Sequence, residues 1–258
     1  MNKIIIENDK IVESDIEYKY TKKENIFDIS KIEFNIDKDS KILLNINIKE
    51  ESKLIITFNI LDNINTELTI ITQGNKSKIQ YNYNLSKNAS INIEKLNILD
   101  SIRELITANL EENSSINYIF KSISYNKENY DYMIYHNGIN SNSNIINNSI
   151  NEQGSIYYQI SSFIPKNITG CSTNQYNRII NKIDNICEIK PNLYIDCDDV
   201  EANHSALIDT FNKNELFYLE SKGINKLDSL KLLEKGFLLS KINDKEIINI
   251  INKKYGGE

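Results

Sequence analysis

Short runs in which apolar and polar residues alternate dominate the chain from Ile4 to about Thr107. A period of two residues is typical of a β-strand that buries one face. The residues that interrupt the runs are Asp, Asn, Ser and Gly rather than Pro. The pattern predicts an all-β region whose clearest strands are Lys31 to Asp37, Lys41 to Ile48, Lys53 to Ile60, Glu67 to Thr72 and Lys78 to Leu85.

The same texture continues from Ile116 to Ile183, and a spacing of about 20 residues between corresponding strands is expected. A sandwich or barrel built from hairpins and a solenoid of stacked turns both fit such strands. Dipeptides that favour hairpins are almost absent, since Asn137-Gly138 is the one Asn-Gly pair and the chain has only eight glycines. Asparagine tolerates the bends of a parallel coil. The sequence therefore favours a β-helix-like solenoid.

A strand region gives way to helices within the segment from Pro191 to Phe237. Leu193, Ile195 and Cys197 alternate with polar residues, and a first helix is then expected from Asn212 to Lys222. Asn225 can cap a second helix, whose apolar stripe ends at Phe237.

A third helix is expected after Asn243, which would form a capping box with Glu246, and its apolar face would be Ile247, Ile250 and Ile251. We expect a β-helix core over residues 1–206 and a helical module over residues 207–258. Three short helices must dock on the solenoid or on a partner to be stable.

Composition and charge narrow the class of protein. The 258 residues can bury a core without disulfides or metals. The net charge of −6 is spread along the chain, so the basic face of a nucleic-acid-binding protein is not expected. No apolar run approaches a membrane span, and the start MNKIIIENDK lacks the core of a signal peptide. With three cysteines, we expect a cytoplasmic protein with free thiols.

Common catalytic motifs are missing from the sequence. It contains no Walker A, GxGxxG, HExxH, GxSxG or paired CxxC segment. We therefore expect a protein that is not itself an enzyme, and any ATP-driven step would need an ATPase from another chain.

Five residues remain as candidates for chemistry. Cys197 shares the parity of the apolar strand positions, so we expect it in the core, and Cys171 beside Gly170 reads as structural. Cys187 shares parity with both apolar and polar neighbours, which leaves burial and function open. His136 precedes Asn-Gly and reads as an exposed or capping residue.

His204 is the strongest candidate. The segment DDVEANHSA places its imidazole close to several carboxylates and near Cys187 in sequence, a donor mixture that suits iron or zinc. The alternative is a histidine that bonds a backbone group at a strand end. The acidic residues from Asp196 to Glu201 by themselves suit a solvated sheet edge.

The segment PNLYIDCDDVEANHSALI, the following NELFYLESKGI and the later LLEKGF resemble the SufB/SufD family of iron-sulfur cluster assembly proteins. Members typically read P-x-L-x-I, an acidic DDV, S-H-G/S-A, LFYL-x-S-R-G-I and a Leu-Leu-x-x-x-Phe helix. Upstream, Gly170, Gln175 and the run from Asn177 to Ile180 are similar to the family's G, Q and RNLLL segment. The specific match covers about Gly138 to Phe237, and before it only the strand-rich texture is shared.

The resemblance implies a right-handed parallel β-helix with a C-terminal helical module, serving as a scaffold on which iron and sulfur are assembled. It implies a SufC-like ABC-type ATPase docked on that module, where we expect Phe217, Leu230 and Phe237 to contribute. It also implies pairing through the β-helices, as a homodimer or with a SufB/SufD paralogue. A transient iron-sulfur cluster or iron would be held near that junction, with His204 and Cys187 as the expected metal ligands.

The sequence departs from the SufB pattern at two positions. Ser205 stands where SufB-type members have a glutamate after the histidine, and the SufB-type cysteine aligns with Asn185, two residues before Cys187. The family's long N-terminal helical region is also missing, so the sequence resembles a short form. Two alternatives remain: a ligand-free, structural SufD-like paralogue, and a β-solenoid that binds or acts on polysaccharide. The second normally needs an export signal and a groove lined by carboxylates.

Overall fold

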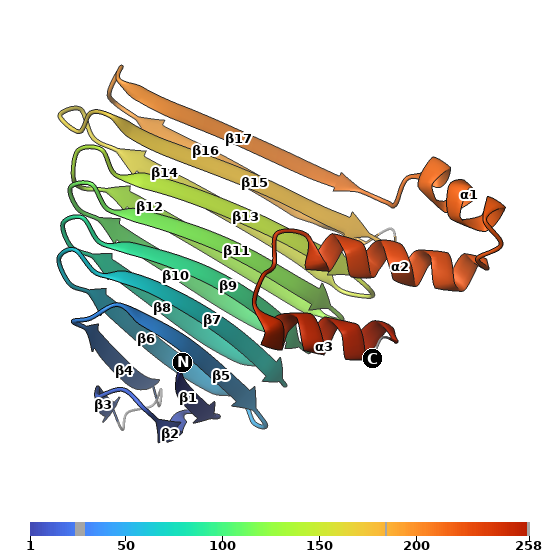
Figure 1. Ribbon diagram of the computed structural model, residues 1–258, viewed down its shortest axis with the longest axis horizontal. Helices are drawn as coiled ribbons and strands as arrows, with labels where there is room; N and C mark the ends of the chain where they lie inside the picture. Colours follow the sequence, from blue (N-terminus) through green and yellow to red (C-terminus); the bar gives the residue numbers. More distant parts are fainter. Residues whose placement is uncertain (24–28, 184, 257–258) are drawn as a thin grey trace.

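A β-solenoid of about seven turns makes up most of the protein, and three helices follow it (Figure 1). The computed structural model describes residues 1–23, 29–183 and 185–256. The predicted solenoid is confirmed, because the strands of each sheet pair in parallel along most of the molecule. Antiparallel pairs occur only near the N-terminus among these residues, between β1 and β2 and between β3 and β4.

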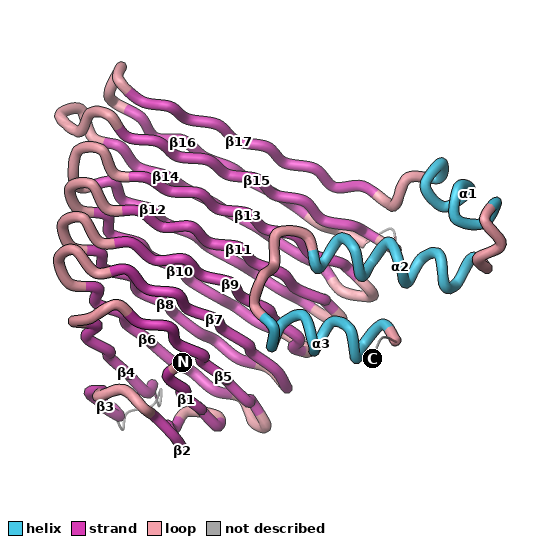
Figure 2. Tube along the Cα trace, viewed as in Figure 1, coloured by secondary structure: helices cyan, strands magenta, loops and turns pink. Residues whose placement is uncertain are grey.

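Two sheets form the walls of the solenoid (Figure 2). The first, sheet A, has the spatial order β17 (Val200–Asp209), β15 (Cys171–Asn181), β13 (Asn142–Asn151), β11 (Ser115–Ser124), β9 (Ser90–Leu99), β7 (Asn65–Gly74), β5 (Ser40–Ile48), β1 (Asn2–Glu7) and β2 (Lys10–Ser14). The second, sheet B, has the order β16 (Glu188–Ile195), β14 (Ser155–Ile164), β12 (Lys127–His136), β10 (Ile102–Leu110), β8 (Ser77–Leu85), β6 (Ser52–Ile60), β4 (Ile29–Ile36) and β3 (Tyr18–Lys23).

The repeat is longer than the expected 20 residues. Side chains that stack on successive turns are 25 residues apart in the first turns, as for Asn63 and Asn88, and 30 apart later, as for Asn147 and Asn177. Most repeating strands have nine to eleven residues, for example β8 and β15, whereas the sequence pattern suggested shorter ones. Polar residues at strand ends hid the true length, because they pair in the sheet without contributing to the apolar alternation.

Asparagines in the left-handed conformation make the bends between turns. Asn63, Asn88, Asn113 and Asn140 have φ between 57° and 64°. Each side-chain amide donates to the amide oxygen of the turn before, at 2.8 to 3.1 Å. Gly170, with φ of 69°, takes the next position and lies against Asn140. Asparagine adopts this conformation more readily than other side-chain-bearing residues. Hydrogen-bonded ladders therefore replace the glycine turns that a hairpin protein would need.

The interior of the middle turns contains a buried charged network. Lys95 and Glu104 form an ion pair with both side chains fully buried, and the Lys95 amine lies 3.9 Å from the centre of the Tyr81 ring. Near them, Glu128 accepts hydrogen bonds from Ser122 and Tyr130 through Oε2, whereas its Oε1 has no partner. Burial raises the pKa of Glu128 to about 7. The surrounding core is otherwise apolar, dominated by Ile and aromatic side chains.

Helices α1 (Lys213–Ser221), α2 (Lys226–Leu239) and α3 (Lys245–Tyr255) form the C-terminal module. Leu238 of α2 and Ile247 and Ile251 of α3 pack on apolar residues of sheet A that face away from the solenoid interior. By contrast, α1 buries no residue and projects from the body (Figure 1). Neither α1 nor the other helices of the described ranges is long and apolar enough to cross a bilayer.

The caps of the first two helices are as predicted, and that of the third is not. Asn212 and Asn225 cap α1 and α2. The N-cap of α3 is Asp244, whose Oδ1 accepts from the backbone of Glu246 and Ile247 and whose Oδ2 accepts from Thr69 at 2.7 Å. The expected cap, Asn243, instead donates its backbone N–H to Glu94. The contact with Thr69 fixes Asp244 as the cap, and it lies 175 residues away in sequence.

Candidate functional site

The end of the solenoid formed by β16 and β17 is open. Each of these strands pairs on one side only within the described chain, β16 with β14 and β17 with β15. Large apolar side chains are exposed on the last turn, among them Ile186 (72%), Tyr194 (55%) and Leu207 (45%). Unpaired strands with exposed apolar residues are a template for pairing with another chain. The open end is therefore the first candidate for function.

An aromatic ladder on the outside of sheet B ends at this turn. The rings of Tyr135, Phe163 and Tyr194 stack with centres 4.8 and 4.9 Å apart and planes within 13°. Their strands are consecutive in the sheet, and Tyr194 on the edge strand has one face without a stacking partner among the described residues. The alternating pattern did not reveal this ladder, because its members occupy the outward positions.

His204 lies on the inner face of the last strand. The parallel register places it beside Gln175 of β15, which is buried. His204 is nevertheless exposed, since no further turn covers it. The Asp and Glu side chains around it in sequence extend from the bend and from the outward positions of β17. The structure therefore presents the imidazole at the mouth of the solenoid interior.

Cys187 also faces inward, at the start of β16. It packs against the apolar core beside Ile189, and Asn151 donates to its sulfur at 3.4 Å. Burial raises the pKa of the thiol above its ordinary value. The protonated thiol is thus favoured at neutral pH, and a thiolate ligand would need a nearby cation to form.

The structure does not bring Cys187 and His204 together. Gln175, the neighbour of His204, donates across the interior to the backbone oxygen of Asn192 at 3.3 Å. Asn192 lies five residues along β16 from Cys187, or about 16 Å at the rise of a strand. No three His, Cys, Asp or Glu side chains within residues 1–23, 29–183 and 185–256 are grouped so that they could hold a metal.

Two of the remaining candidates lie elsewhere than expected. His136 is completely buried rather than exposed, and its ring nitrogens bond the hydroxyls of Ser141 and Ser143 at 2.8 and 3.0 Å. Burial lowers its pKa to about 4, so the ring is neutral at physiological pH. Cys197 is half-exposed in the bend after β16, because the strand ends at Ile195. Cys171 is buried, as expected of a structural residue.

The three residues expected to dock a partner differ in exposure. Phe217 on α1 is 72% exposed, whereas Leu230 and Phe237 on α2 are half-buried. The Phe237 ring meets that of Phe211 edge to face, with centres 6.3 Å apart. The guanidinium carbon of Arg178 lies 5.5 Å from the Phe237 ring centre. Phe237 therefore belongs to the junction between the module and the solenoid.

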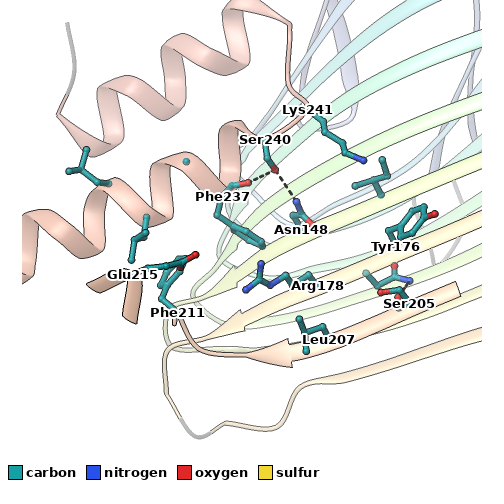
Figure 3. A pocket seen from close by; sticks show the side chains of 15 residues that line it. Asn148, Tyr176, Arg178, Ser205, Leu207, Phe211, Glu215, Phe237, Ser240 and Lys241 are labelled. Carbon is teal, nitrogen blue, oxygen red and sulfur yellow. Dashed lines mark hydrogen bonds between the residues drawn. The ribbon is translucent and has the colours of Figure 1, made fainter. Parts of the chain in front are cut away.

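A cavity of about 540 Å³ lies at this junction, between α2 and the outer face of sheet A (Figure 3). Its wall includes Tyr176, Arg178 and Leu207 from the strands. Phe237 and Lys241 contribute from α2 and the turn that follows it. Sequence reasoning missed this cavity, because it depends on where the helices dock.

Comparisons with known proteins agree with this arrangement. A family model described as "SUF system FeS cluster assembly, SufBD core domain" matches residues 4–237. The protein "Iron-sulfur cluster assembly protein SufD" of Bacillus subtilis (strain 168) is 34% identical over 74 residues. That match covers 26% of this chain and 17% of the relative, so it spans less than a fifth of the relative's length.

Proposed function

Because the chain belongs to the SufBD core-domain family of iron-sulfur cluster assembly proteins, we propose that it is a scaffold subunit of a Suf-type complex. In this proposal the protein has no catalytic activity of its own and works in the cytoplasm with a SufC-like ABC-type ATPase. Iron or a nascent iron-sulfur cluster is its cargo and is held only transiently. The single observation that carries the proposal is the family match over residues 4–237.

The open end of the solenoid is the proposed junction with a second subunit, either another copy or a SufB/SufD paralogue. Its support is the pair of one-sided edge strands, β16 and β17, with the exposed residues Ile186 and Tyr194. A partner strand would satisfy the free backbone groups of the edge and cover these side chains.

His204 is the proposed ligand that this chain contributes to the cargo at the junction. An exposed imidazole on the inner face of the last turn can meet ligands from a partner. Cys187 is a weaker ligand in this scheme, since it is half-buried, its thiol pKa is raised by burial, and it lies at the other end of β16. Iron bound by His204 would thus take its remaining ligands from the partner subunit.

A second candidate role is that of a ligand-free structural subunit resembling SufD. It is favoured by the separation of Cys187 from His204 and by the name of the Bacillus subtilis relative. Both roles share the fold and the open end. They differ in whether His204 binds iron.

The helical module is the proposed docking site for the ATPase. Helix α1 buries none of its residues against this chain and exposes Phe217 and Tyr218. A nine-residue helix has little stability in isolation, so a partner that covers its apolar side chains would stabilise it. In this arrangement Phe217 contacts the partner directly, and Leu230 and Phe237 hold α2 in place beneath it.

Anaerobic reconstitution with ferrous iron and sulfide tests the ligand role. The chain, purified with its pairing partner, should gain visible absorption from a bound cluster, and His204→Ala should lose most of it. Asn203→Ala is the matched control, because Asn203 is the preceding residue on β17 and bonds only Asn174 through its side chain. Equal iron content in the wild-type and His204→Ala proteins would favour the ligand-free role.

A further inference from the structure

Lys121 of β11 is a buried lysine with only neutral hydrogen-bond partners. Its side chain is fully buried, and the amine donates to Ser240 Oγ at 3.1 Å. With the Asn148 amide turned so that its oxygen faces the amine, that oxygen accepts at 2.8 Å. No carboxylate of the described chain forms an ion pair with Lys121. A buried ammonium without a counterion is costly, so this arrangement is unusual.

Charges around Lys121 make the imbalance larger. Burial lowers the pKa of Lys121 to about 7, the nearby Lys241 lowers it further, and only Glu94 opposes the shift. Lys241 follows α2 in a left-handed conformation with φ of 63°. Its amine lies 5.8 Å from the centre of the Tyr176 ring and forms no ion pair with any described carboxylate. Two amines without counterions therefore lie close together.

Both amines adjoin the cavity beneath α2. Asn148, Ser240 and Lys241 line one end of it, and Lys121 lies directly behind the first two. Figure 3 shows the side chains of these three lining residues at one end, with Tyr176 close to Lys241.

The other end of the cavity is apolar, and its own charges are largely balanced. Phe211, Phe237 and Leu207 line it. Arg178 is engaged by Asp209 through two hydrogen bonds, at 2.9 and 3.3 Å. The excess positive charge is thus confined to the Lys121 and Lys241 end.

From this asymmetry we propose that the cavity binds a small organic anion. A carboxylate, phosphate or sulfonate group would lie against Lys241, Ser240 and Asn148, where it neutralises the two amines. A flat apolar body would lie between the rings of Tyr176 and Phe237. The volume of about 540 Å³ lies within the usual range for pockets that bind small molecules. This site is separate from His204 and from the exposed face of α1.

Two fluorescent probes of similar shape and different charge test the proposal. 8-Anilinonaphthalene-1-sulfonate carries an anionic group on an aromatic body, and N-phenyl-1-naphthylamine has the same rings without the charge. We expect one saturable sulfonate site on the full-length protein. Lys121→Met and Lys241→Met should each weaken sulfonate binding about tenfold or more, as expected for losing one charged partner. Both should leave the affinity for the uncharged probe within about twofold.

Lys226→Met is the matched control, because Lys226 is an exposed lysine at the start of the same helix and does not line the cavity. It should leave both affinities unchanged. Lys241 is exposed, so its replacement tests the charge even if Lys121→Met fails to fold. Sulfonate affinity within about twofold of wild type in Lys241→Met would overturn the proposal, as would equal losses for both probes.

Discussion

His204 and Gln175 are neighbours in the parallel register of β17 and β15, yet Gln175 is buried and His204 is exposed. Both occupy the inner face, so the difference comes only from the absence of a further turn over β17. The same absence leaves the backbone of β17 and β16 free along one edge. The last turn thus has the side-chain pattern of an interior turn and the exposure of a surface.

Removing the apolar character of this edge should prevent pairing. The double variant Ile186→Lys, Tyr194→Lys places two charges on the last turn, where lysine discourages strand association. Light scattering after size-exclusion chromatography should show a mainly monomeric chain, with a dissociation constant raised at least about tenfold over wild type. The unfolding midpoint of the monomer should not fall, because both side chains are exposed. An unchanged dimer mass would place the junction elsewhere.

The buried Glu128 should make stability fall as the pH rises. Its folded-state pKa is raised from 4.5 to about 7 by burial, with Glu104 adding to the shift. The folded protein therefore binds a proton more tightly than the unfolded chain, and this stabilisation is lost as the pH rises through about 7. Over that range the loss from Glu128 is on the order of 3 kcal/mol.

Glu128→Gln keeps the shape of the side chain and removes its charge. Urea denaturation should give similar free energies of unfolding for both proteins at about pH 5 and a more stable variant at about pH 8. Equal differences at the two pH values would show that Glu128 is not the titrating group.

The cap of α3 gives a test of how the module is held on sheet A. Asp244→Ala removes the hydrogen bonds to Glu246, Ile247 and Thr69, and it should lower the free energy of unfolding by about 2 kcal/mol or more. Asn243→Ala should cost less than about 0.5 kcal/mol, because the main bond of Asn243 to Glu94 is made by its backbone. A larger loss in Asn243→Ala than in Asp244→Ala would contradict the assignment.

Sequence patterning predicted the elements well and the environments of single residues less well. The solenoid, most strands and two helix caps follow from local rules of alternation and capping. His136 was misjudged because its burial depends on Ser141 and Ser143 of the next strand, which no local pattern shows. Cys197 was misjudged because β16 ends two residues earlier. The open end and the cavity depend on which turn is last and where α2 docks.

Purification of the protein after co-expression with a SufC-like ABC-type ATPase tests the central claim most directly. The account predicts a complex that survives size-exclusion chromatography. Phe217→Asp should abolish it, and Val12→Asp, which alters an exposed apolar residue on the distant strand β2, should leave it intact. Failure of the wild-type chain to bind the ATPase, or an undiminished complex with Phe217→Asp, would contradict the account.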